Sequence, residues 1–155
     1  MNFRITGLEA AQFEHLFGLS DAELKAHNAK RYVADEKPGF PCRLTLEDAE
    51  PGESLLLVPY RHQTSHTAYA SHGPIFIRER QAPRGECVDE IPEQIKVRLI
   101  SLRAYDANGM MIDADVVDGS ALKPLIERFL AREDTSYLHA HFARRGCYAA
   151  LIRRA

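Results

Sequence analysis

The sequence predicts an α+β fold in a single domain, with a mainly antiparallel sheet, one longer amphipathic helix and two short N-terminal helices. Short apolar runs that alternate with polar residues recur along the chain between glycine- and proline-containing turns, as in antiparallel sheets. One stretch, 120–133, repeats its apolar residues at helical spacing. The length of 155 residues fits one domain, and no repeat or linker divides the chain.

The first third of the chain predicts two short helices between two strands. Apolar and polar residues alternate over 3–5, which indicates a short opening strand. Residues 9–17 carry apolar side chains at helical spacing and end at a glycine. Ser20 and Glu23 match a capping box, in which the hydroxyl and the carboxylate bind free amides at the start of a second short helix. A strand is expected over 32–35.

The middle of the chain predicts strands and a hairpin. The apolar run 55–58 follows a proline–glycine turn and indicates a buried strand, and 75–78 indicates another. A long connection, 60–74, separates them. Asn108 and Gly109 both tolerate positive φ and stand between alternating segments, which predicts a hairpin with a two-residue turn.

The last third predicts the longer helix and a second hairpin. The helix 120–133 places five apolar residues on one face, namely Leu122, Leu125, Ile126, Phe129 and Leu130. Pro124 falls in its first turn, where the missing amide costs little. Two alternating segments, 137–142 and 147–152, flank a turn and predict the final hairpin.

The composition excludes several classes of protein. A net charge of −2, 45% hydrophobic and 27% charged residues are typical of a globular domain and predict no nucleic-acid partner. The chain has no Walker loop, dinucleotide fingerprint or Cys-x-x-Cys pair, so we expect no nucleotide cofactor. It has three cysteines, no export signal, and no apolar run long enough to span a bilayer. We therefore expect a cytoplasmic protein with reduced thiols and no membrane partner.

Four short motifs occur together in the chain: Pro41-Cys42-Arg43, Ser71-His72-Gly73-Pro74-Ile75-Phe76, Arg103-Ala104-Tyr105 and His141-Phe142-Ala143-Arg144-Arg145-Gly146-Cys147. As a set they resemble a bacterial family known as a domain of unknown function, family 1203. The resemblance spans nearly the whole chain and includes its length. It implies a shared fold and a bacterial origin, and it implies no catalytic role, because no activity is established for the family.

The residues with the richest chemistry lie in the final hairpin. Side chains alternate along a strand, so His139 and His141 project from the same face. Two imidazoles and the thiolate of Cys147 would suit a transition metal. The alternative is two polar side chains on a half-exposed strand beside a small buried thiol.

The position of the thiol depends on the turn of this hairpin. If Arg144, Arg145 and Gly146 form a three-residue turn, Cys147 shares the face of the histidines. If the turn is 143–146, the thiol faces the other way. Glycine in the third position favours the three-residue turn.

Two further segments contain candidate site residues. The connection 60–74 is dense in imidazoles and hydroxyls, among them His62, Ser71 and His72, and connections of this length are often functional or mobile. Cys42 precedes Arg43, whose guanidinium would make the thiol more reactive if the two side chains met.

Three functional hypotheses follow. The first is a module that binds a small molecule or anion between 60–74 and 137–152, where Arg144 or Arg145 would hold an anion. The second is a metal-assisted enzyme that uses His139 and His141. The third is an interaction protein that self-associates, as a homodimer in its expected form, through a sheet edge or the exposed face of the final hairpin.

Overall fold

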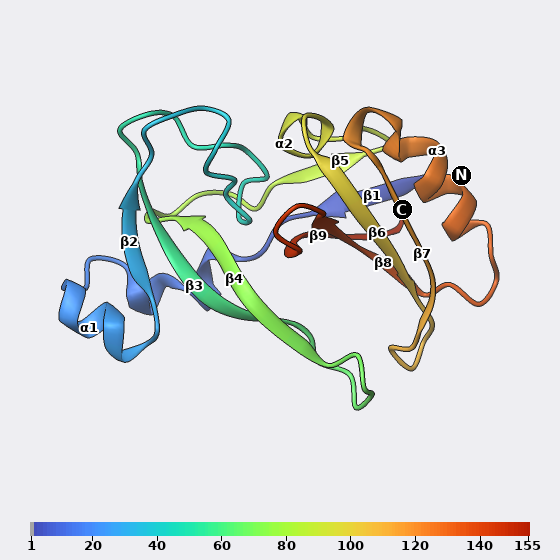
Figure 1. Cartoon of the computed structure of the whole chain (residues 1–155), viewed down its shortest axis with the longest axis horizontal. Coiled ribbons are helices and arrows are strands. Elements are labelled where there is room, and N and C mark those ends of the chain that lie inside the picture. The colour runs from blue at the N-terminus through green and yellow to red at the C-terminus, as the bar shows by residue number, and fades with distance from the viewer. Residues whose placement is uncertain (1) are drawn as a thin grey trace.

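The structure is a computed structural model that describes residues 2–155, and it contains two antiparallel sheets (Figure 1). The larger sheet has six strands in the order β5-β1-β9-β8-β6-β7, and the smaller has three in the order β2-β3-β4. The strands of the larger sheet are β1 (Phe3–Thr6), β5 (Glu86–Val88), β6 (Leu99–Tyr105), β7 (Met111–Asp118), β8 (Tyr137–Phe142) and β9 (Cys147–Arg154). Those of the smaller sheet are β2 (Lys30–Val33), β3 (Ser54–Gln63) and β4 (Ser71–Arg78).

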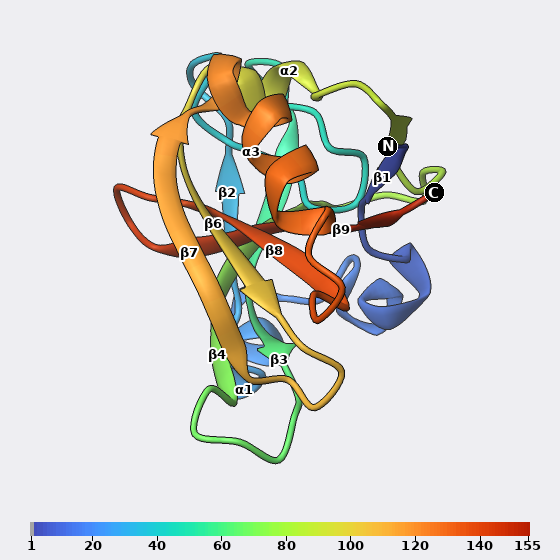
Figure 2. The ribbon, with the colours of Figure 1, turned by 90° about the vertical axis from the view of Figure 1, so that its right-hand side faces the viewer.

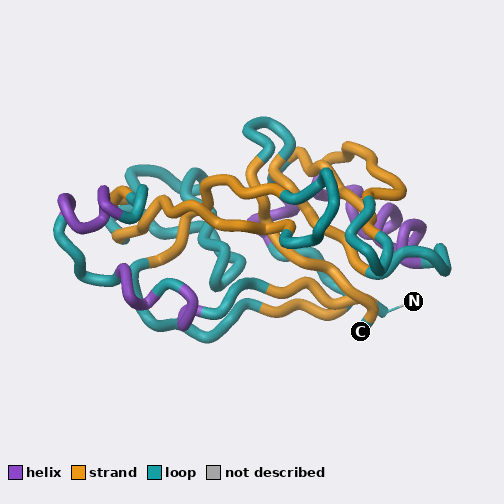
Figure 3. Tube along the Cα trace, turned by 90° about the horizontal axis from the view of Figure 1, so that it is seen from below, coloured by secondary structure: helices purple, strands orange, loops and turns teal. Residues whose placement is uncertain are grey.

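Helices are few and short, which confirms the predicted α+β class. They are α1 (Asp21–Ala26), α2 (Glu93–Lys96) and α3 (Leu122–Leu130), with 3-10 turns η1 (Ala10–Gln12), η2 (Glu14–Leu16) and η3 (Gly119–Ala121). Seen from below, α1 lies toward one end of the molecule and α3 toward the other, with strands between them (Figure 3). No helix among residues 2–155 is long and apolar enough to cross a membrane.

The longer helix covers one face of the six-stranded sheet (Figure 2). All five apolar residues predicted for its inner face are buried there. Strand alternation supplies the opposite side of this core through Phe3, Ile5, Leu102, Leu138 and Ile152. The helix ends at Leu130, earlier than expected, where the Arg154 guanidinium donates to the Leu130 and Arg132 carbonyls. The other face of the sheet is therefore free of α3 and carries polar and aromatic side chains.

A second core joins the two sheets. It buries Leu56 and Val58 of β3 with Ile75 and Ile77 of β4. Tyr148 belongs to the same core, although it lies on β9 of the larger sheet. The smaller sheet thus packs against the face of the larger sheet that α3 leaves free.

The N-terminal helices are only partly as expected. Residues 9–17 form two 3-10 turns rather than one helix, and neither turn begins with a side-chain cap. The second helix, α1, has the predicted capping box, because the Glu23 amide donates to Ser20 Oγ and the Ser20 amide donates to Glu23 Oε1, each at 3.2 Å. The single turn α2 was not predicted, since four residues are too few to show a helical period.

The connection 60–74 is shorter than predicted. β3 continues to Gln63 and β4 begins at Ser71, so only 64–70 are outside the strands. Pro59 pairs with Pro74, at positions where prolines argue against a strand. Pro59 is tolerated because the pairing of β3 with β2 extends only to Leu57, opposite Lys30 where β2 begins, so no carbonyl of β2 needs an amide from residue 59.

The hairpin between β6 and β7 is confirmed, but its loop has five residues, 106–110, rather than two. Asp106 Oδ1 accepts hydrogen bonds from the amides of Asn108 and Met110, at 2.8 and 3.0 Å. Within this loop, Gly109 is the one residue with a positive φ, of 79°. The carboxylate of Asp106 therefore stabilises a wider loop than the Asn-Gly pair suggests.

Candidate functional site

Three histidines meet on the face of the larger sheet that α3 leaves free. His139 and His141 come from β8, and His62 comes from the end of β3. One nitrogen of each ring lies within 4.8 Å of a nitrogen of each of the others. We call His62, His139 and His141 the histidine cluster.

Strand register explains this meeting. Side chains alternate along β8, so His139 and His141 point to the same face, beside Arg103 and Ser101 of β6. A bulge between Ala140 and His141 pairs His141 with Tyr148 of β9. β3 passes over this point, and an irregularity between Tyr60 and Gln63 brings in the third ring. The His62 ring centre lies 4.8 Å from that of His141 and 6.1 Å from that of His139.

The two β8 histidines are buried and neutral. His139 is 5% exposed and His141 is 0% exposed. Burial is the main cause that lowers the pKa of both imidazoles to about 3; nearby histidine and arginine side chains contribute to this shift, and a hydrogen bond to Gly146 opposes it for His141. Burial also lowers the pKa of His62. At neutral pH each buried ring therefore carries one nitrogen lone pair that can bind a ligand.

The ring nitrogens differ in their partners. His141 Nδ1 lies 2.9 Å from the Gly146 carbonyl oxygen, to which it donates, so the Nε2 lone pair points away from the turn. A backbone carbonyl that fixes an imidazole in this way is typical of metal-binding histidines. The Nδ1 atoms of His62 and His139 are buried and have no hydrogen-bond partner among residues 2–155. Two buried ring nitrogens are thus left to bind something that is not part of the chain.

Tyrosines hold the histidine rings in place. The Tyr148 ring stacks on His62, with centroids 5.6 Å apart and planes 7° apart. Tyr105 and Tyr137 contact His139, at 5.0 and 5.2 Å between centroids. These large rings leave the histidines little freedom to turn.

Two arginines flank the cluster without an acidic partner. Arg103 Nη1 lies 3.5 Å from His141 Nε2, and the Arg153 guanidinium lies 6.0 Å from the centre of the Tyr137 ring. Within residues 2–155 neither arginine forms an ion pair, whereas nearby Arg84 pairs with Glu9 at 3.2 Å. The surroundings of the histidines are therefore positively charged.

A cavity of about 390 Å³ opens beside the cluster. His62 and His139 line it, together with Tyr137, Tyr148 and Arg153. The segment that follows β1 also lines it, through Gly7, Leu8 and Glu9. A small molecule in this cavity would lie next to two of the three histidines.

The structure corrects the expected position of Cys147. The turn has four residues, 143–146, and the Gly146 amide donates to the Phe142 carbonyl at 2.8 Å. Phe142 pairs with Cys147, so the thiol faces away from His139 and His141, contrary to the register that Gly146 favoured. The bulge between Ala140 and His141 places the Tyr148 side chain on the face of the sheet that carries the histidines. The third group in the cluster is His62 of β3, and not the Cys147 thiol of β9.

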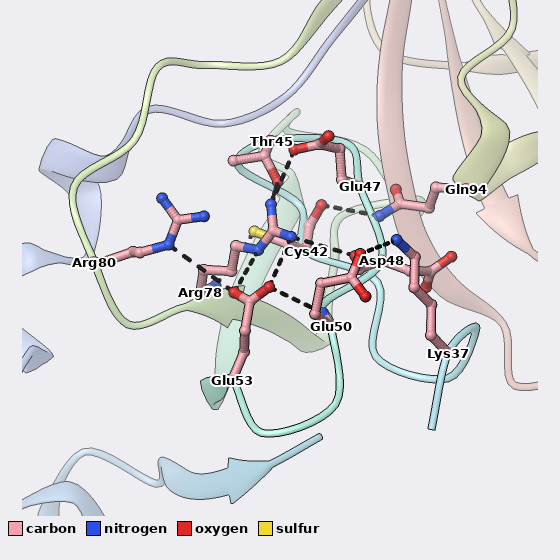
Figure 4. A network of polar contacts seen from close by, with 10 residues as sticks. All are labelled: Lys37, Cys42, Thr45, Glu47, Asp48, Glu50, Glu53, Arg78, Arg80 and Gln94. Atoms are coloured by element: carbon pink, nitrogen blue, oxygen red, sulfur yellow. Dashed lines mark hydrogen bonds and ion pairs between the residues drawn. The ribbon is translucent and has the colours of Figure 1, made fainter. Parts of the chain in front are cut away.

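Cys42 and Arg43 have structural positions away from the cavity. The buried Cys42 sulfur accepts the Arg78 amide at 3.2 Å, within a network in which the Arg78 guanidinium ties Thr45, Glu47 and Glu53 to β4 (Figure 4). Arg43 is buried and donates to the carbonyls of Pro41 and Tyr148, at 2.7 and 2.8 Å. Its guanidinium lies over the Phe142 ring, and its hydrogen bonds go to backbone carbonyls rather than to the Cys42 thiol.

The remaining predicted site residues are exposed. Ser71 and His72 lie at the start of β4, and Arg144 and Arg145 lie in the last turn, and none of the four lines the cavity. The arginines beside the cluster are Arg103 and Arg153, which were not among the predicted site residues. Arg103 belongs to the motif Arg103-Ala104-Tyr105, and alternation along β6 places the Arg103 and Tyr105 side chains on one face of the strand. The position of Arg103 could therefore have been predicted from the sequence.

The comparisons with known proteins support one assignment. No curated protein and no solved structure matches the chain. A family model described as a protein of unknown function (DUF1203) matches residues 39–154, which include all three histidines and both flanking arginines. The chain belongs to this family.

Proposed function

We propose that the chain holds a divalent transition-metal ion between His62, His139 and His141, and that the ion binds a small molecule in the adjoining cavity. The observation that carries this proposal is the convergence of three imidazoles, two of which have a buried Nδ1 without a partner in residues 2–155. The chain thus supplies neutral ligands that need not lose a proton to bind a metal ion.

The ligand set fits a catalytic rather than a structural metal site. Structural zinc sites use four protein ligands, whereas three histidines leave one coordination position open for water or a substrate. Zinc–nitrogen bonds of about 2.0–2.1 Å place tetrahedral ligand atoms about 3.4 Å apart. The nitrogens here lie within 4.8 Å of one another, so the rings need to approach by at most about 1.4 Å on binding.

The residues around the cluster fit metal-assisted chemistry. A bound ion of this kind polarises a substrate oxygen or lowers the pKa of a bound water. His141 keeps its orientation through the Gly146 carbonyl, and Tyr148 stacks on His62. The cavity supplies room for a small molecule beside His62 and His139.

A cobalt titration tests this proposal. The protein is purified without chelator for metal analysis, stripped, and titrated with Co²⁺, whose visible bands report a site with nitrogen ligands. We expect one equivalent of metal per chain and a loss of at least tenfold in Co²⁺ affinity in His139→Ala. His62→Ala, at the half-buried edge of the cluster, gives the same test where His139→Ala fails to fold.

His27→Ala is the matched control, because His27 is exposed at the end of α1 and lies outside the cluster. We expect it to bind Co²⁺ like the wild type. A folded wild-type protein that binds neither Co²⁺ nor Zn²⁺ overturns the proposal, and so does unchanged affinity in both cluster variants.

We further propose that the chain works in the reducing cytoplasm. All three cysteines are free, and the fold does not depend on a disulfide. Thiol titration of protein unfolded directly from fresh lysate should find three reactive thiols per chain, whereas fewer than three would count against this location.

A further inference from the structure

We infer that the molecule bound at the histidine cluster carries an oxyanion, a carboxylate or phosphate group, and that Arg153 binds it. The inference rests on the proposed metal site and names the class of ligand that the site takes. Its basis is an arginine without an acidic partner that lines the same cavity as His62 and His139.

Arg153 owes its position to the strand register. It lies on β9 on the same face as Tyr148, beside Tyr137 of β8. Tyr137 is itself held by Gln63, whose amide donates to the phenol oxygen at 2.9 Å. The guanidinium therefore stands at the cavity, where its fork of donors can bind two oxygens of a carboxylate or phosphate.

The other charges around the cavity do not neutralise Arg153. Glu9 and Arg84 also line the cavity, but Arg84 Nη1 lies 3.2 Å from Glu9 Oε1, so these two groups balance each other. One positive charge remains, on Arg153.

Arg103 adds a reason for the anion to bind together with the metal ion. Its guanidinium lies 3.5 Å from His141 Nε2 and is held by Ser101 Oγ at 3.3 Å. A positive charge so close to a ligand atom opposes a bare divalent ion. An oxyanion on the ion reduces the net charge, so each should strengthen the binding of the other, and the coupling must be the same in both directions.

The experiment measures this coupling with defined probes. Co²⁺-loaded protein is titrated at constant ionic strength with sodium acetate, with inorganic phosphate, and with acetamide as the uncharged control. We expect a shift of the visible bands with acetate, phosphate or both, and none with acetamide. The effective anion should raise Co²⁺ affinity at least fivefold. A response to acetate alone identifies a carboxylate ligand, and a response to phosphate alone identifies a phosphate ligand.

Arg153→Gln is the test variant, and Arg145→Gln is its matched control, because Arg145 is exposed in the last turn and its loss removes the same charge. We expect Arg153→Gln to weaken anion binding at least tenfold while it still takes up Co²⁺, and Arg145→Gln to match the wild type. If Co²⁺ binds but neither anion shifts its bands, or if Arg153→Gln responds like the wild type, the inference is wrong and the metal site stands.

If the protein binds no Co²⁺, calorimetry on the metal-free protein tests the oxyanion site separately from the metal site. The proposed metal site then fails. Heat of acetate or phosphate binding that disappears in Arg153→Gln but not in Arg145→Gln would still support the oxyanion site. No such heat would overturn it.

Discussion

Tyr148 holds a central position among the residues of the candidate site. Its ring is nearly parallel to His62 and almost perpendicular to His139 and His141, at 86° to each. It also belongs to the core that joins the two sheets. Tyr148 therefore positions the histidines, and it does so through the shape of its ring.

Substitution of Tyr148 separates ring shape from the hydroxyl group. Tyr148→Leu removes the flat surface against His62, and we expect Co²⁺ affinity to fall about tenfold or more, as for other groups that orient metal ligands. Tyr148→Phe keeps the ring and should bind Co²⁺ like the wild type. Both are measured by Co²⁺ titration of folded protein, and equal affinity of the two variants would show that the ring does not orient the site.

The ionisation of Glu79 is strongly tied to folding. Both of its oxygens accept hydrogen bonds, from Arg31 Nε and Nη2 at 2.8 and 2.6 Å, from the Gly18 amide and from Ser54 Oγ. The bonds from Arg31 lower the pKa of this carboxyl group to about 2, against the desolvation that raises it. The carboxylate thereby connects the smaller sheet to the segment before α1.

The lowered pKa of Glu79 predicts a loss of stability in acid. Because the folded-state pKa lies below the ordinary value of 4.5, folding favours the ionised form, so this stabilisation is complete above about pH 5 and is lost as the pH falls toward 2. The difference in free energy of unfolding between wild type and Glu79→Gln should be constant above about pH 5 and shrink below it by on the order of 3 kcal/mol. Urea unfolding between pH 7 and pH 2.5 measures it. Exposed Glu133, changed to Gln, is the control, and a difference for Glu79→Gln that is independent of pH would contradict the assignment.

At the scale of elements, Gly119 lets η3 lie directly against α2. Its amide donates to the Arg98 carbonyl at 2.8 Å. A Cβ atom at this position would lie 1.9 Å from the Ile95 carbonyl oxygen, which is backbone and cannot turn aside. Glycine is therefore required where the turn before α3 meets α2.

Gly119→Ala should destabilise the protein by about 3 kcal/mol or more, because the two elements must move apart to admit the methyl group. Gly73→Ala in β4 is the matched control, since no atom lies within 4 Å of its added Cβ, and we expect a change within about 0.5 kcal/mol. Thermal unfolding and urea titration of the two variants give the comparison. Equal stability of the two would mean that η3 and α2 separate without cost.

Predictions for the elements were accurate where a local pattern decides the structure. The helix α3, the capping box of α1 and both hairpins follow from periodicity and capping, which act within a few residues. Loop lengths were less predictable, because the five-residue loop depends on the Asp106 side chain, and β3 continues past Pro59, beyond the stretch that pairs with β2. Both depend on partners that a local window does not include.

At the scale of the whole molecule, a pair of arginines connects the segment before β3 to the larger sheet. Arg43 and Arg98 lie over the Phe142 ring, at 4.9 and 5.0 Å. Arg98 forms a two-pronged ion pair with Asp48, at 2.7 and 2.9 Å. Burial lowers the pKa of Arg43 to about 10, so it stays protonated at neutral pH and donates to the Pro41 and Tyr148 carbonyls.

Arg43→Met should lower the free energy of unfolding of the metal-free protein by about 2–3 kcal/mol, because the Pro41 and Tyr148 carbonyls lose their donors. Arg145→Met in the exposed turn is the control and should change stability by less than about 0.5 kcal/mol. Urea unfolding measures both. Similar losses in the two variants would show that Arg43 does not connect the sheets.

The strand order shows which strands form the edges of the larger sheet, through which self-association is predicted. β8 and β9 are inner strands of the six-stranded sheet, and most of their side chains are buried or half-buried between α3 and the smaller sheet. The exposed parts of the final hairpin are residues 144–146 of its turn and 153–154 at the end of β9, so self-association through this hairpin stays a prediction. The edges of that sheet are β5 and β7, so a homodimer through an edge remains a prediction that a measurement of mass in solution would test.

The sequence by itself determined the α+β class, the amphipathic helix, the two hairpins and the common face of His139 and His141, because each depends on residues near one another in the chain. Only the tertiary structure decided which third group joins the two histidines. His62 reaches them because β3 crosses the larger sheet, and Cys147 does not because a four-residue turn directs it to the other face. The packing of one sheet on another and the length of a turn depend on contacts between distant segments, and these contacts are not encoded in any local pattern.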